Sequence, residues 1–305
     1  TRAKSQQVRL IGLNVAVIAV IAGVLANTLP LVVLGAIGVA IAIAWHVIEL
    51  FLGMRRALPS RFGLTGRYYI AAGLLLILGI GLAVELTRGG SGAGTSLVLS
   101  HATINLFGWV GLSILGTLIT LWPTMLHTRV SPDAQQHGRI ALVPLVIGTL
   151  VAAAGLVLAI RPLAVVGVVG YAIGIVALAG PFVSETRARR PNDFATWSVL
   201  AGLAWLVGCV SAYAVILAIP GSWEQTADRA GWLTAAATVG FVAQVLLGSL
   251  SYLLPVMVGG GPTVLKWRNS VVNRGAATRV VAANTGLLVC VLPVPSVVRV
   301  LASVV

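Results

Sequence analysis

Long apolar runs alternate with short polar segments along nearly the whole chain. About nine runs approach 20 residues, the length of helix that crosses the roughly 30 Å hydrocarbon core of a bilayer. The runs lie at about 10–29, 31–54, 68–87, 98–122, 140–159, 163–184, 194–219, 233–257 and 279–302. The pattern predicts an all-α fold, a polytopic bundle of about nine transmembrane helices. Pro293 and Pro295 are expected to bend the last helix.

Composition argues against a soluble catalytic domain. Charged residues make up 9% of the chain and hydrophobic residues 58%, whereas about a quarter of a soluble domain is charged. The expected partner is therefore the lipid bilayer. An excess of basic over acidic residues, 20 to 7, suggests nucleic acid in a soluble protein. Here most basic residues lie in short segments between apolar runs, so we expect no nucleic-acid partner. Residues 1–305 are interpreted as one transmembrane domain, and both ends look like cuts in a longer polypeptide.

The basic residues are distributed unequally between alternate connecting segments. If the N-terminus is cytoplasmic, sixteen of the twenty lie on the inside, and the opposite orientation reverses that ratio. The inside residues are Arg2, Lys4, Arg9, Arg55, Arg56, Arg61, Arg67, Arg129, Arg139, Arg187, Arg189, Arg190, Lys266, Arg268, Arg274 and Arg279. We therefore predict a multi-pass protein of the cell membrane with a cytoplasmic N-terminus. An odd number of helices then places the C-terminus on the extracytoplasmic side.

Two segments of the chain have similar sequences. Residues 108–125 read GWVGLSILGTLITLWPTM and residues 240–257 read GFVAQVLLGSLSYLLPVM. We call the shift that maps position 108 onto position 240 the repeat offset. At this offset the second segment has the same residue as the first at Gly108, Val110, Leu115, Gly116, Leu118, Leu121, Pro123 and Met125. The two helices are four apart in order, so they cross the membrane in the same direction and suggest a parallel repeat of halves roughly 1–130 and 131–305. The alternative is chance similarity between leucine-rich helices.

Few residues in the apolar runs could carry chemistry. His101 lies near the outer end of its predicted helix, and Asn105 and Gly108 follow on the same face. A neutral imidazole in a helical bundle is a common ligand for haem iron or copper, so His101, with Asn105, is the candidate cofactor or metal site. The alternative is a histidine that bonds to a neighbouring helix or loop. No catalytic arrangement of side chains is recognised.

His46 and Glu49 form a second candidate, since they lie three apart on one face of the second predicted helix. We interpret them as a buried polar pair near the inner third of the bilayer. His46 is expected about 20 Å below the outer surface and His101 about 5 Å below it, at a rise of about 1.5 Å per residue. A haem shared between these two histidines is therefore not expected.

Four segments resemble a known family. They are RRALPSRFGLTGRYYIAAG (55–73), HATINLFGWVGLSILGTLITLWPTMLHTR (101–129), AQVLLGSLSYLLPVMVGGGP (243–262) and NTGLLVCVLPVPSVVRV (284–300). They are similar to the membrane region of actinobacterial membrane-bound multicopper oxidases of the copper nitrite reductase type. The spacing of His101, Asn105 and Gly108 also resembles, more distantly, helices of haem-copper oxidase subunit I. The resemblance implies extracytoplasmic cupredoxin domains, which hold the copper and are absent from this chain.

Three classes of function follow. The leading hypothesis is the membrane domain of a copper-dependent oxidoreductase. Such a domain would anchor the copper domains and relay electrons to them, from quinol or through a haem b, without being the catalytic part itself. The parallel repeat and the pair His46 and Glu49 suggest a transporter or channel instead. The third class is a purely structural membrane anchor.

Overall fold

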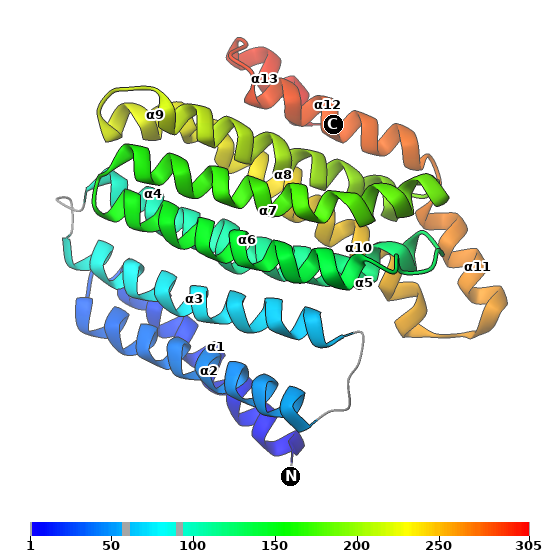
Figure 1. Ribbon diagram of the computed structural model, residues 1–305, viewed down its shortest axis with the longest axis horizontal. Coiled ribbons are helices and arrows are strands. Elements are labelled where there is room, and N and C mark those ends of the chain that lie inside the picture. Colours follow the sequence, from blue (N-terminus) through cyan, green and yellow to red (C-terminus); the bar gives the residue numbers. More distant parts are fainter. Residues whose placement is uncertain (1, 57–61, 90–93, 305) are drawn as a thin grey trace. The chain divides into compact units, whose positions relative to one another are not determined.

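The computed structural model describes residues 2–56, 62–89 and 94–304. These residues are almost entirely helical and include no strand, which confirms the expected all-α bundle (Figure 1). The chain forms two compact units, Thr1–Thr117 with Gly138–Gly174, and Leu118–His137 with Ile175–Val305. Arg61, which was expected on the cytoplasmic side, lies outside the described residues.

Eight described helices are long and apolar enough to cross a membrane, so the chain fits a multi-pass membrane protein. The first four are α1 (Arg2–Leu25), α2 (Leu29–Arg56), α3 (Gly63–Gly89) and a continuous helix made of α4 (Thr95–Thr103), the π-helix η2 (Ile104–Gly111) and α5 (Leu112–Met125). The next four are α6 (Ala134–Val157), α7 (Arg161–Ala188), α8 (Phe194–Ala218) and a continuous helix made of α9 (Trp223–Ala235), the π-helix η3 (Ala236–Ala243) and α10 (Gln244–Val258).

The helix bounds recur along the chain at the repeat offset. The offset maps α1 (Arg2–Leu25) onto α6 (Ala134–Val157) and α2 (Leu29–Arg56) onto α7 (Arg161–Ala188). The two π-helices obey the same offset, because η2 begins at Ile104 and η3 at Ala236. The offset that relates the two similar sequence segments thus also relates the backbone of four helices to that of the next four.

Equivalent turns connect the first two helices of each set. The second residue after each first helix has a positive φ, 51° at Asn27 and 56° at Ala159, and the repeat offset maps one residue onto the other. A positive φ is uncommon for a residue other than glycine. The same three backbone hydrogen bonds close both turns, and the last of them runs from Thr28 to Gly23 and from Ile160 to Gly155. An unusual backbone conformation is therefore preserved at both positions although the side chains differ.

Glycines allow the helices of the first hairpin to approach closely. A Cβ atom on Gly23 would lie 2.7 Å from the Val32 amide nitrogen, and one on Gly35 would lie 2.7 Å from the Val20 amide nitrogen. Their counterparts at the repeat offset, Gly155 and Gly167, face the backbone of the partner helix in the same way. Helices in lipid associate through such close packing rather than through the hydrophobic effect.

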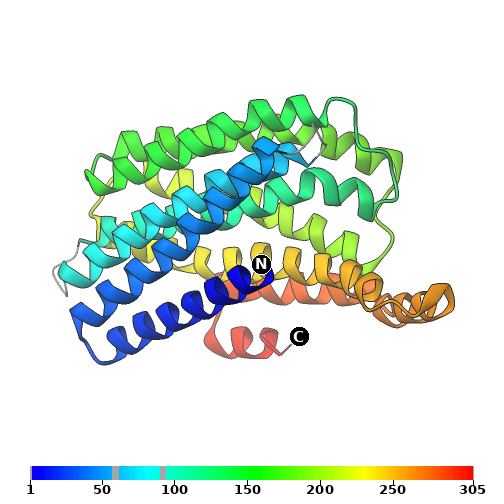
Figure 2. The ribbon, with the colours of Figure 1, turned by 90° about the horizontal axis from the view of Figure 1, so that it is seen from below.

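The expected ninth helix at 279–302 differs from the structure. The chain instead forms α12 (Ala276–Val291) and α13 (Ser296–Ala302), separated by the prolines at 293 and 295. Proline lacks the backbone N–H that would continue the helix. At about 1.5 Å per residue, the 16 residues of α12 extend about 24 Å, less than the roughly 30 Å core of a bilayer. α12 packs beside α8, and α13 returns along α12 (Figure 2).

A short helix precedes α12. α11 (Gly261–Val272) follows α10 after a glycine turn. The Asn273 side chain then accepts a hydrogen bond of 3.0 Å from the Phe194 backbone N–H at the start of α8. The Arg279 guanidinium stacks over the Phe194 ring, 4.4 Å from its centre. These contacts fix the beginning of α12 beside the beginning of α8.

Candidate functional site

His101 lies on α4 and contacts the backbone of α3. Its Nδ1 atom is 3.0 Å from the carbonyl oxygen of Gly79. Because a carbonyl oxygen only accepts hydrogen bonds, Nδ1 donates and carries the proton of the neutral ring. The other ring nitrogen, Nε2, then has its lone pair in the plane of the ring. The side chain is partly exposed on the surface of the described chain.

Asn105 lies against the face of the same imidazole. Its amide nitrogen is 3.3 Å from Nδ1 and 3.4 Å from Nε2 of His101. A point nearly equidistant from both nitrogens lies over the ring face, because in the ring plane it would overlap the carbon between them. The amide donates instead to the His101 carbonyl oxygen at 2.8 Å. Asn105 thus supports the ring without occupying the direction of the Nε2 lone pair.

The absence of a side chain at Gly79 makes room for this arrangement. A Cβ atom there would lie 2.8 Å from the Asn105 amide nitrogen and 3.0 Å from its oxygen. Gly108, one turn further along, is packed in the same direction, since a Cβ atom on it would lie 3.0 Å from Leu75 of α3. The stripe of His101, Asn105 and Gly108 predicted from the sequence therefore faces α3.

The π-helix η2 begins three residues after His101 and is held by α7. Each backbone hydrogen bond of a π-helix spans one more residue than that of an α-helix, so the bonding pattern shifts where the π-helix begins and ends. Such segments are frequent at functional sites. The Tyr171 hydroxyl donates to the Phe107 carbonyl oxygen at 3.3 Å, and the two rings pack with centres 5.0 Å apart. Gly111 leaves space for that hydroxyl. The unusual backbone is thus stabilised from the first half of α7.

His46 and Glu49 do not form the expected buried pair. Both residues are exposed on the described chain. The Glu49 carboxylate forms an ion pair with Arg9 of α1 and accepts a hydrogen bond of 3.0 Å from the Trp45 indole. Helical spacing put His46 and Glu49 near one face, but it did not reveal that α1 supplies an oppositely charged partner for the carboxylate.

Glu185 is a buried carboxylate that the sequence reasoning missed. It lies in the last turns of α7 with only 4% of its surface exposed, and it accepts a hydrogen bond of 3.0 Å from the Ser131 backbone N–H. The neighbouring Thr186 hydroxyl accepts a hydrogen bond of 3.2 Å from the buried Trp122 indole. The sequence prediction ended this helix at residue 184, so Glu185 was not considered. Its position directly after an apolar run was the available signal.

A polar cluster in the second unit was also missed. The Asn284 side chain of α12 exchanges two hydrogen bonds of 2.9 Å with Gln244 at the start of α10. Its oxygen also accepts a bond of 2.7 Å from the Trp205 indole of α8. Gly240 of η3 packs against the Trp205 ring. Polar residues within apolar helices were the signal, but their partners are 40 and 79 residues away in sequence.

The remaining histidines lie apart from His101. His127 is exposed after α5, and its ring lies 6.2 Å from that of Tyr252. His137 is bonded through Nδ1 to the Ala177 carbonyl oxygen at 2.7 Å. In the ranges that the structure describes, no three His, Cys, Asp or Glu side chains come together as a metal site.

Comparison with known proteins does not place the chain in a family. Neither a family model, nor a curated protein, nor a solved structure matches it significantly.

Proposed function

We propose that the chain is the membrane domain of a copper-dependent oxidoreductase in which His101 would hold a b-type haem. The observation that carries the proposal is the hydrogen bond of 3.0 Å from His101 Nδ1 to the Gly79 carbonyl oxygen. Histidines that bind metals typically donate their second ring nitrogen to a carbonyl or carboxylate, which fixes the tautomer and the ring orientation. The same bond leaves Nε2 as the ligating atom.

The residues around His101 are compatible with this role. Asn105 lies over the ring face and does not compete for the Nε2 lone pair. Gly79 and Gly108 keep α3 close, so that the carbonyl stays within reach of Nδ1. When bound, haem exchanges single electrons, and the potential depends on the axial ligand and its hydrogen bonds. The protein's part is to orient the imidazole.

His46 is not proposed as the second ligand. His101 lies six residues after the beginning of α4 at Thr95, and His46 lies seventeen residues after the beginning of α2 at Leu29. At about 1.5 Å per residue these positions are about 9 Å and about 26 Å along their helices. Both helices begin at the same predicted outer face. The two imidazoles are therefore too far apart in depth to share one iron.

The distribution of basic residues supports the proposed orientation of the domain in the membrane. The N-terminus is proposed to be cytoplasmic because sixteen of the twenty basic residues then lie inside. His101 is then near the extracytoplasmic face, where cupredoxin domains attached to the chain or another redox partner would accept electrons. Quinol in the bilayer is the proposed donor. The extracytoplasmic C-terminus expected from nine spans is not part of this proposal, because the 16 residues of α12 are too short for a ninth span.

The proposal is tested by the difference spectrum between dithionite-reduced and oxidised protein, purified from membranes of a host that synthesises haem. We expect a Soret band with α and β bands, and we expect His101→Ala to remove them while the helical circular dichroism persists. His127→Ala is the matched control, because His127 lies in an exposed turn. A wild-type protein without these bands, or bands unchanged by His101→Ala, would leave the anchor or transporter hypothesis in place.

A second candidate function is transport, and the two π-helices favour it. η2 and η3 interrupt the fourth and eighth spans at positions related by the repeat offset. Paired interruptions in corresponding helices of two repeats are typical of the substrate site of a transporter. Each π-helix has polar side chains nearby. His101 and Asn105 lie at η2, and Gln244 and Asn284 lie at η3. Proteoliposomes that show solute flux without a haem spectrum would favour this function.

A further inference from the structure

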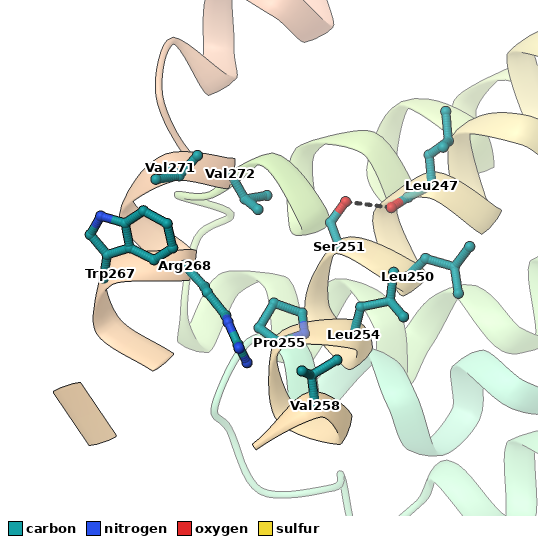
Figure 3. Close-up of a pocket in the computed structure, with 10 residues that line it drawn as sticks. All are labelled: Leu247, Leu250, Ser251, Leu254, Pro255, Val258, Trp267, Arg268, Val271 and Val272. Atoms are coloured by element: carbon teal, nitrogen blue, oxygen red, sulfur yellow. Dashed lines mark hydrogen bonds between the residues drawn. The ribbon is translucent and has the colours of Figure 1, made fainter. Parts of the chain in front are cut away.

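A groove opens between the end of α10 and α11. Gly259, Gly260 and Gly261 all have positive φ, between 70° and 105°. Residues other than glycine rarely adopt this conformation. This turn reverses the chain and lays α11 beside the last turns of α10 (Figure 3). The groove between them has a volume of about 560 Å³, within the roughly 300–1,000 Å³ range of sites that hold small molecules.

The groove has apolar walls. α10 contributes Leu247, Leu254 and Val258, and α11 contributes Trp267 and Val271. The side chains of Leu254, Val258 and Trp267 are 49%, 65% and 65% exposed. A surface of this kind suits an acyl chain, and an exposed indole suits the interface between lipid and water.

A cation lies at the rim of the groove. Arg268 extends from α11 toward Pro255 and Val258 (Figure 3), and its guanidinium donates to the Gly259 carbonyl oxygen at 2.6 Å. A guanidinium has five N–H donors, so a bond to the backbone fixes it and leaves donors for an oxyanion. An apolar channel with a fixed guanidinium at one end matches a phospholipid, with the acyl chain in the groove and the phosphate at Arg268.

The charge around the groove selects the kind of lipid. Residues 259–280 contain four basic residues, Lys266, Arg268, Arg274 and Arg279, and no acidic one. A zwitterionic headgroup would bring its own cation into this positive region, whereas an anionic headgroup would not. The segment also follows the eighth span and is on the proposed cytoplasmic side, where anionic lipids attract basic segments.

We propose that the groove between α10 and α11 binds an anionic phospholipid, with its phosphate at Arg268 and one acyl chain along Leu254 and Trp267. This site is separate from the proposed haem site, so each can fail without the other. α11 is then an interfacial helix, whose apolar residues at 264, 267, 271 and 272 recur at helical spacing on the face that carries Arg268.

Trp267 provides a direct reporter of occupancy. The protein is reconstituted into vesicles that contain dibrominated phosphatidylglycerol or dibrominated phosphatidylcholine, which quench nearby indoles. Subtracting the fluorescence of Trp267→Phe isolates the signal of this residue from the other tryptophans. We expect phosphatidylglycerol to compete about fivefold better than phosphatidylcholine, the preference expected from one cation at the membrane surface.

Substitutions then test the role of the guanidinium. Arg268→Gln should reduce the preference to about equal binding, and Arg268→Lys should retain it. Arg274→Gln is the matched control, because it removes a nearby exposed cation that does not line the groove. Equal quenching by both lipids in the wild type would overturn the proposal. So would a preference that survives Arg268→Gln, or one that Arg274→Gln abolishes equally. Absence of quenching by either lipid would mean that another occupant, such as protein, fills the groove.

Discussion

Gly35 allows α2 to cross α1 at short distance, so replacing it by alanine tests how the hairpin is packed. A Cβ atom at this position would lie 2.7 Å from the Val20 amide nitrogen and 2.8 Å from the Ala16 carbonyl oxygen. Ordinary contacts of a Cβ atom are 3.4 Å or longer. Because both obstructing atoms belong to the backbone, no change of rotamer can make room. The helices would have to separate locally by about 0.7 Å, the difference between 3.4 and 2.7 Å.

Two opposing terms determine the stability of Gly35→Ala. Alanine stabilises a helix interior by about 0.5–1 kcal/mol relative to glycine, whereas inserting a methyl group into a packed interface costs about 1–3 kcal/mol. Gly53 lies on the same helix with nothing within 4 Å of a Cβ atom. Gly53→Ala therefore carries the first term alone. The difference between the two variants measures the packing term, about 1–3 kcal/mol.

The free energy of unfolding can be measured by titration with sodium dodecyl sulfate in mixed micelles, followed by circular dichroism. We expect Gly53→Ala to be as stable as the wild type or more stable, and Gly35→Ala to be less stable than Gly53→Ala. Equal free energies for the two alanine variants would refute the close approach of α1 and α2. They would also remove the physical reason for the equivalent glycine at 167 in the second hairpin.

Three further predictions test other parts of the chain. In a background of Cys209→Ala and Cys290→Ala, an impermeant thiol reagent added outside should label Thr28→Cys but not Gln136→Cys; labelling of Gln136→Cys alone would invert the topology. Asn284→Leu should lower the free energy of unfolding by about 1–3 kcal/mol, because it leaves Gln244 and the Trp205 indole without their shared partner; an unchanged stability in the same titration would show that the cluster contributes nothing. Glu185→Gln keeps an acceptor for the Ser131 N–H whereas Glu185→Leu removes it. Only Glu185→Leu should therefore lower the free energy of unfolding, by about 1–3 kcal/mol. Equal stabilities of the two variants would contradict the role of Glu185 as the acceptor for Ser131.

The membrane-spanning helices could be predicted from sequence because their signal is local. A run of about 20 apolar residues identifies a span without knowledge of its neighbours, and the first eight expected runs correspond to the eight long helices. The ninth was a different problem. Its composition was apolar enough, but the prolines at 293 and 295 divided it into α12 and α13. An apolar composition indicates that a segment can lie in lipid. Whether that segment forms one continuous helix depends also on its prolines, which lack the backbone N–H.

Partners between helices were harder to predict, because sequence spacing determines a face and not what covers it. The stripe containing His101 and Asn105 was recognised, yet its partner Gly79 carries no side chain and contributes a carbonyl oxygen. Glu49 was expected to interact with His46 three residues earlier, but Arg9 of α1 neutralises it. The carboxylate is paired with a cation 40 residues away in sequence and not with the neighbour on its own helix. Such choices depend on which helices are adjacent, and periodicity does not contain that information.

The two sets of helices preserve backbone features more closely than polar side chains. The turns at Asn27 and Ala159, the hairpin glycines and both π-helices recur at the repeat offset. At the same offset His101 corresponds to Leu233, and Asn105 corresponds to Ala237. The parallel repeat of the two halves stays a prediction. Because only the first set of helices has a histidine at this position, we expect one haem site per chain rather than two. A measured ratio of one haem per chain is therefore the outcome that fits both the repeat and the proposed ligand.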